Sequence, residues 1–160
     1  MSKVGLHILL GPRTGYGNLL RQCSDAGSPL ALVKVVDDFA PAKEAKDINP
    51  KTITIGRIRE IDDVFDPNGD IEIQAIRWYD RAYETWNAHR SYIDYWEPLN
   101  EISSHWDEQT DFNLELAERA ERDGFKLCPF NFSTGNPPQP KDDGGVAYRA
   151  IVRCCKALKR

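Results

Sequence analysis

Short β-like runs alternate with helical patterns five times along this chain, and this alternation restricts the fold more than any other feature. The β-like runs are apolar or alternate with period two, and the intervening segments carry apolar residues at helical spacing. Strands are predicted at 4–10, 30–36, 52–58, from 93–96 and at 126–132, and helices at 18–26, 41–47, 71–89, 110–123 and from 145 onward. Strict alternation predicts parallel strands covered by helices, which is the α/β class.

Two α/β architectures fit this pattern, a partial (β/α)8 barrel of the TIM type and an open doubly wound parallel sheet. Eight units of the observed length would need about 256 residues, which is close to the ~250 residues typical of the barrel. Five strands in 160 residues would by length alone suit a small open sheet. In either case the length predicts a single domain over residues 1–160.

The composition excludes several classes of partner. The formal net charge is -4 and charged residues make up 29% of the chain, so there is no basic footprint for nucleic acid or for an anionic membrane. No run approaches the roughly 18 apolar residues that span a bilayer, and the first residues lack the features of a signal peptide. We therefore expect a cytoplasmic protein that binds neither nucleic acid nor membrane.

The sequence also predicts no metal and no cofactor. Its four cysteines form no Cys-x-x-Cys pair, so neither a zinc site nor a disulfide framework is indicated. The glycine-rich segment 11–17 follows the first predicted strand but lacks the Gly-Lys-Ser/Thr ending of a phosphate-binding loop. Leu20 stands where the third glycine of a dinucleotide-binding fingerprint would be, and turn formation explains these glycines better.

The most informative motif is Tyr-Trp-Glu-Pro-Leu-Asn-Glu at residues 95–101. It follows an apolar strand and precedes a polar loop, so Asn100 and Glu101 are predicted at the carboxyl end of the fourth strand. Functional residues of barrel enzymes gather at that end because strand tips hold side chains rigidly. The alternative is a helix-start turn, in which Asn100 is a cap and Glu101 favours the positive end of the helix.

This motif resembles the fourth strand of retaining glycoside hydrolases built on (β/α)8 barrels, where a Trp-Glu-x-x-Asn-Glu-like stretch ends the strand. The resemblance covers roughly residues 1–138, and residues 139–160 diverge from it. It implies that the partner is a carbohydrate, that Glu101 is the general acid/base, and that Asn100 contacts the sugar 2-hydroxyl. Trp96 is a further candidate for substrate binding, because aromatic faces stack on sugar rings.

Polar residues also follow other predicted strands and are candidates for substrate contact. Asp37 follows the second strand, Arg59 the third and Asn136 the fifth. For Asp37 and Arg59, an ion pair that closes the rim of the sheet is an equally good interpretation.

In the resembled clan the nucleophilic glutamate comes from a seventh strand, and this chain is predicted to stop after five units. A retaining mechanism needs a second carboxylate about 5 Å from the first, so we expect a truncated hydrolase-like protein that is inactive alone. Its two open sheet edges would allow copies of the chain to pair. A competing hypothesis is a non-catalytic α/β interaction or regulatory module.

Overall fold

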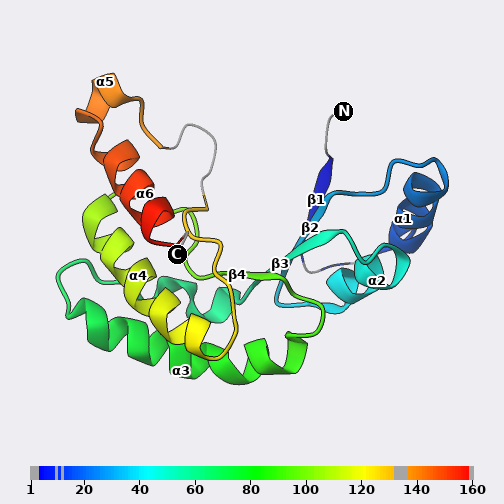
Figure 1. The fold of residues 1–160 in the computed structure, drawn as a ribbon, viewed down its shortest axis with the longest axis horizontal. Coiled ribbons are helices and arrows are strands. Elements are labelled where there is room, and N and C mark those ends of the chain that lie inside the picture. The colour runs from blue at the N-terminus through cyan, green and yellow to red at the C-terminus, as the bar shows by residue number, and fades with distance from the viewer. Residues whose placement is uncertain (1–3, 10, 12, 132–136, 159–160) are drawn as a thin grey trace.

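The computed structural model describes residues 4–9, 11, 13–131 and 137–158, and shows an α/β protein with an all-parallel sheet (Figure 1). The sheet contains β1 (Gly5–Ile8), β2 (Leu32–Val36), β3 (Ile53–Arg57) and β4 (Tyr95–Glu97). The helices are α1 (Tyr16–Asp25), α2 (Ala40–Ile48), the 3-10 helix η1 (Arg59–Val64), α3 (Ile71–His89), α4 (Trp106–Arg122), α5 (Pro140–Asp143) and α6 (Val146–Ala157). The predicted α/β class is therefore confirmed.

The strands lie in the order β1-β2-β3-β4, so each new strand is added on the same side of the previous one. A doubly wound sheet reverses its strand order at a switch point, and the described sheet contains no such reversal. Because crossovers between parallel strands are right-handed, a progressive order places the connecting helices on one face of the sheet. The opposite face is left without helices of its own.

The two faces of the sheet differ in composition. The helix-covered face carries Val33 and Val35 of β2, Thr54 of β3 and Trp96 of β4, all of them buried. Side chains alternate between faces along a strand, and the strand register therefore puts a second set of residues on the uncovered face. This set consists of His7, Leu32, Lys34, Val36, Ile53, Ile55, Arg57, Tyr95 and Glu97.

The predicted fifth strand at 126–132 is present only as two isolated bridges parallel to β4, so five complete units are not confirmed. Leu127 pairs with Trp96, and Asn131 pairs with Asn100. Between them, Pro129 lacks an amide hydrogen and Phe130 has a φ of 61°, which interrupts the extended backbone. The last predicted residue of this strand, Phe132, lies outside the described residues.

The chain then returns to pack α6 against α4, the helix of the preceding unit. Ala147 and Ala150 of α6 form a small buried cluster with Trp106, and Phe130 packs against this cluster. Helices α3, α4 and α6 lie together at one end of the molecule, while α1 and α2 lie at the other (Figure 1). Among the described residues, no helix combines the length and the apolar character needed to cross a membrane.

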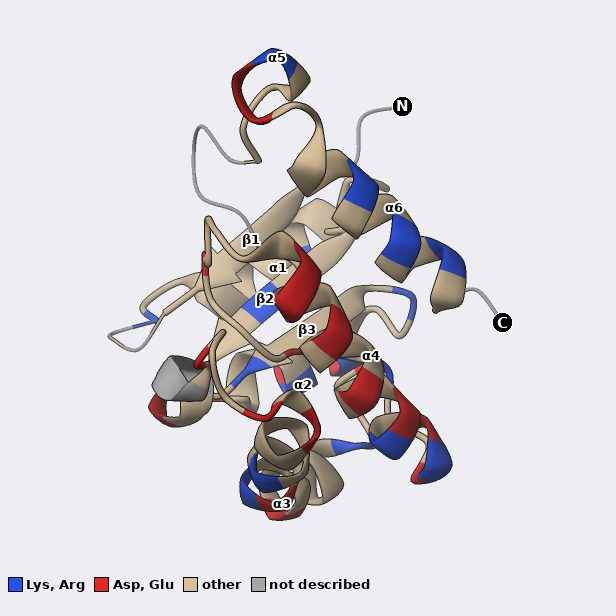
Figure 2. Ribbon diagram, turned by 90° about the vertical axis from the view of Figure 1, so that its left-hand side faces the viewer, with Lys and Arg blue, Asp and Glu red and all other residues tan. Residues whose placement is uncertain are grey.

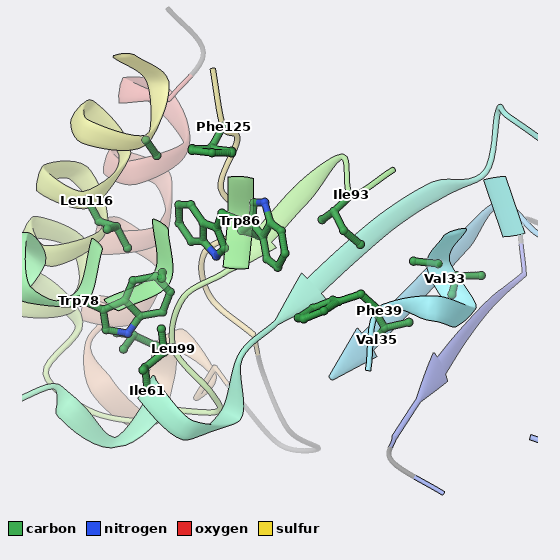
Figure 3. Close-up of a cluster of buried hydrophobic side chains, with 14 of the residues drawn as sticks. Val33, Val35, Phe39, Ile61, Trp78, Trp86, Ile93, Leu99, Leu116 and Phe125 are labelled. Carbon is green, nitrogen blue, oxygen red and sulfur yellow. The ribbon is translucent and has the colours of Figure 1, made fainter. Parts of the chain in front are cut away.

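The main core joins the covered face of the sheet to the helices through a group of tryptophans (Figure 3). Trp86 of α3 stacks on Trp96 of β4 with ring centroids 5.4 Å apart and an angle of 16° between the rings. Gly56 of β3 lies beneath Trp96, and a Cβ atom at this position would be 2.5 Å from the Trp96 ring. Close approach of the Trp96 ring to the backbone therefore requires glycine at position 56.

Gly56→Ala is expected to destabilise the protein by about 1–3 kcal/mol, because the Trp96 ring would have to shift within a packed core. The measurement is the free energy of unfolding in urea. Gly17→Ala is the matched control, since the new Cβ in α1 would meet the flexible ends of the Glu44 and Arg21 side chains, and alanine favours helix. Equal stability of the Gly56→Ala variant and the wild type would contradict this description of the core.

Candidate functional site

The uncovered face of the sheet carries a cluster of charged side chains toward the carboxyl ends of the strands. Lys34 of β2 reaches across β3 to Glu97 of β4, with 2.6 Å between Lys34 Nζ and Glu97 Oε2. Arg57 of β3 lies between them, with its Nε 3.9 Å from Glu97 Oε1. All three are largely buried: the side-chain exposure is 12% for Lys34, 10% for Arg57 and 3% for Glu97.

Glu97 is held in an environment that works against its charge. Burial raises the pKa of its carboxyl group, while Lys34, Arg57 and a hydrogen bond from Asn131 oppose this shift without cancelling it. Glu97 Oε1 is buried and accepts no hydrogen bond from the described residues. A buried carboxylate is costly unless it is paired, and the ammonium group of Lys34 at 2.6 Å is the partner closest to Glu97.

Asn100 follows β4 and its amide is oriented by two donors. Its Oδ1 accepts a hydrogen bond from Arg57 Nη1 at 2.6 Å and another from Asn131 Nδ2 at 3.0 Å. Because both partners donate, the atom that they contact must be the amide oxygen of Asn100. The amide nitrogen, Asn100 Nδ2, then points the other way, and none of the described residues provides an acceptor for it. The arrangement presents an N–H group at the carboxyl end of β4, suited to a hydroxyl or other oxygen of a ligand.

Glu101 is exposed and lies next to Asn100 in a left-handed backbone conformation with a φ of 50°. His7 of β1 lies on the uncovered face beside Lys34. Burial, Lys34 and Arg57 lower the pKa of His7, and the charge of Glu101 opposes them.

Asp37 and Arg59 form the ion pair that was the alternative to substrate contact. Arg59 Nε lies 3.5 Å from Asp37 Oδ2, and the backbone N–H of Arg59 donates to Asp37 Oδ1 at 2.7 Å. Their side chains therefore tie the residue after β2 to the residues after β3. Asn136, the third of these candidates, lies outside the described residues.

Trp96 lies on the helix-covered face of the sheet, opposite Lys34, Arg57 and Glu97. It is 1% exposed and lies between Trp86 and Gly56, with Phe39 5.3 Å away at its edge. Neither face of its ring is open to a sugar, so its position is that of a core residue. The reason is the alternation of side chains along β4, which sends Trp96 to the helices and its neighbours Tyr95 and Glu97 to the uncovered face.

Sequence reasoning did not select Lys34, Arg57 and Asn131, which hold Glu97 and Asn100 in place. A signal for the first two exists, because each is the lone charged residue in a predicted strand that is otherwise apolar or uncharged, Leu-Ala-Leu-Val-Lys-Val-Val and Thr-Ile-Thr-Ile-Gly-Arg-Ile. Three strained positions had no signal. Asp37, His105 and Phe130, like Glu101, adopt a positive φ, and His105 differs from the others in preceding α4 rather than following a strand.

Strained backbone of this kind costs on the order of 1–3 kcal/mol per residue and tends to gather at functional sites. Here Asp37 follows β2, Glu101 follows β4, and Phe130 lies beside β4 in the partly paired segment. All three occur toward the carboxyl ends of the strands, where Asn100 also lies. The described residues contain no group of three or more His, Cys, Asp or Glu side chains able to hold a metal ion.

No family model, curated protein or solved structure matches the chain. The role of the candidate site must therefore be argued from its geometry.

Lys34→Met is expected to lower the free energy of unfolding by about 3 kcal/mol at pH 8, because it leaves the Glu97 carboxylate buried without its partner. The loss should be smaller at pH 5. Without Lys34, the pKa of Glu97 in the folded state should rise further above its value in the unfolded chain. Stability then falls as pH rises between these two pKa values, because the unfolded chain loses its proton first, and it levels off once Glu97 is ionised in both states. Urea unfolding at the two pH values measures the difference.

The control for this prediction is Lys43→Met, which removes an exposed ion pair with Asp47 in α2. Such pairs contribute about 0–1 kcal/mol, so this variant should remain close to the wild type at both pH values. A Lys34→Met variant that loses no more stability at pH 8 than at pH 5 would show that Glu97 is not a buried charge.

Glu101→Gly is expected to raise the unfolding free energy by about 1 kcal/mol, because glycine adopts a positive φ without steric cost. For a chain of this size the corresponding rise in Tm is about 2–4 °C. Glu101→Ala keeps a Cβ atom in the strained conformation and should give no such rise. Equal Tm values for the glycine and alanine variants would show that position 101 is unstrained.

Proposed function

We propose that the uncovered face of the sheet is a carbohydrate-binding face and that the chain forms part of the wall of a (β/α)8-type barrel related to retaining glycoside hydrolases. Two features of the fold support the barrel. The strand order is progressive, with no reversal point. The segment containing Leu127 and Asn131 runs beside β4 and is followed by α6, which packs next to α4 as the helix of a fifth unit would.

The observation that carries the proposal is the fixed orientation of Asn100. Arg57 and Asn131 hold the amide oxygen, and the amide nitrogen is then available for a sugar hydroxyl at the carboxyl end of β4. Glu101 lies next in the chain and is exposed, as a carboxyl group that must reach a glycosidic oxygen has to be. Sugars suit such a face because their hydroxyl groups pair with fixed donors and acceptors.

The same geometry argues for binding without hydrolysis by this chain alone. Retaining cleavage requires a nucleophilic carboxylate across the glycosidic bond from the acid, at about 5 Å. Glu97 is the nearest carboxylate along β4, and it is buried in contact with Lys34 and Arg57. Glu101 is therefore the acid/base half of a catalytic pair, and catalysis would require a second carboxylate from elsewhere.

Pairing of two copies through open sheet edges is the arrangement that we propose for completing the face. β1 is one edge of the described sheet, and an unpaired edge presents backbone donors and acceptors to another strand. A second candidate function is a protein-interaction module without carbohydrate affinity. The exposed apolar residues of α6 favour this alternative.

Asn100→Ala is expected to weaken oligosaccharide binding by at least tenfold, because one well-placed hydrogen bond to a ligand contributes roughly 1–3 kcal/mol when its partner would otherwise be unsatisfied. The measurement is isothermal titration calorimetry with neutral glucose, mannose and xylose oligosaccharides. Glu101→Gln should bind within threefold of the wild type, since it keeps the shape of the side chain, and no variant should release reducing sugar.

Asn87→Ala is the matched control, because it removes an exposed amide of α3, a helix that packs on the covered face of the sheet and not on the face of the site. Carbohydrate affinity that is equal in Asn100→Ala and Asn87→Ala would contradict the proposed role of Asn100. Absence of binding to every oligosaccharide tested would favour the interaction module.

A further inference from the structure

Only part of the apolar surface of the C-terminal helix α6 is covered by α4, and the rest is exposed. Ala147, Ala150 and Cys154 are buried, and they lie at helical spacing on the side that packs against α4. Tyr148 and Val152 are four residues apart on an adjacent side, with 43% and 47% exposure. A helix that is apolar over more than one face is usually covered on more than one side.

The uncovered side of α6 is hollowed into a shallow groove. Its volume is about 470 Å³, and it is lined by Tyr148, Arg149, Val152, Arg153 and Lys156. An apolar strip with basic residues along its margin therefore runs over most of the helix. We call the four residues Tyr148, Arg149, Val152 and Lys156 the α6 strip.

Charge decides what kind of partner can cover the α6 strip. Residues 146–157 include Arg149, Arg153 and Lys156 and no acidic side chain. Arg153 is used within the chain, where it pairs with Asp107 and Asp111 of α4 at 3.6 and 3.0 Å. In Figure 2 the α6 ribbon with its Lys and Arg positions lies on the same side of the molecule as the α4 ribbon with its Asp and Glu positions.

Arg149 and Lys156 form no ion pair with the described residues; Arg149 Nη1 donates instead to the carbonyl oxygen of Gly144 at 2.7 Å. Two copies meeting face to face through this helix would bring these cations together, and residues 146–157 of neither copy contain an acidic side chain to pair with them. Like charges facing each other across an interface are unfavourable. A second copy of α6 is therefore a poor occupant of the strip.

We propose that the α6 strip binds an acidic amphipathic helix of a partner protein. The apolar face of that helix would cover Tyr148 and Val152, and its flanking Glu or Asp side chains would pair with Arg149 and Lys156. This is the mode in which a helix lies in an apolar groove and is read through residues at i, i+3, i+4 and i+7. Within the chain, Arg153 of α6 already pairs in this way with acidic side chains of a neighbouring helix, α4. The inference does not depend on the carbohydrate site.

The test uses the whole chain and a fluorescein-labelled synthetic helix of 18 residues, with leucines at i, i+3, i+4 and i+7 and glutamates on both flanks. Fluorescence anisotropy should give saturable binding that weakens as salt concentration rises, because ion pairs at the surface are screened. The double variant Tyr148→Ser/Val152→Ser should bind at least tenfold more weakly. Arg149→Glu/Lys156→Glu should lose binding to the acidic peptide and gain binding to a peptide with lysine in place of glutamate.

Leu19→Ser/Ile73→Ser is the matched control, because these side chains have similar exposure of 43% and 44% and lie on α1 and α3. It should bind the acidic peptide like the wild type. Circular dichroism checks that each variant folds. We expect all of them to fold, because the altered side chains are exposed.

Two outcomes would overturn the proposal. One is affinity for the acidic peptide that is equal in the wild type and the Tyr148→Ser/Val152→Ser variant. The other is a dimer in solution that becomes a monomer in that variant, which would assign the strip to a second copy of the chain. Light scattering after gel filtration distinguishes a dimer from a monomer.

Discussion

The packing of Trp96 between Gly56 and Trp86 fixes the orientation of β4, and the candidate site depends on that orientation. Because side chains alternate along a strand, a tryptophan directed into the helix layer sends Glu97 to the opposite face. There Glu97 meets Lys34 from β2, and Arg57 lies between the two and reaches Asn100. A one-residue shift of β4 would place a carboxylate in the tryptophan core and an indole over Lys34, so the core and the site require the same register.

Stability alone does not explain why the uncovered face of the sheet carries buried charged side chains. Replacing a buried ion pair by apolar side chains is often neutral or stabilising, so the buried Lys34–Glu97 pair is not by itself a source of stability. Three residues toward the same end of the strands also keep a strained, left-handed backbone. Both features cost free energy, which the tryptophan core on the other face offsets. Such costs are usual where a protein holds polar groups ready for a ligand.

The sequence predicted the class of the fold well because the alternation of strands and helices is a local pattern. It predicted Asn100 and Glu101 at the end of β4 for the same reason, since a strand end is visible in the chain. Trp96 was proposed as a sugar-binding residue because it is aromatic. The alternation of side chains along β4, which directs it into the helix layer, was not considered. Lys34 and Arg57 were overlooked because their role depends on cross-strand contacts, and only the register of the sheet reveals which distant residues meet. The interrupted fifth strand had a visible cause in Pro129, which cannot donate to a neighbouring strand.

The two uncovered surfaces of the molecule differ in the physics by which they would recognise a partner. The sheet face offers fixed hydrogen-bonding groups and buried charges, and a ligand there gains affinity by satisfying groups that the protein already orients. The α6 strip offers apolar area and the two cations Arg149 and Lys156, and a partner there gains affinity by removing that area from water. Small polar ligands suit the first surface and an amphipathic helix suits the second. Occupation of one surface therefore does not require occupation of the other, and the carbohydrate proposal and the partner-helix proposal can be tested independently.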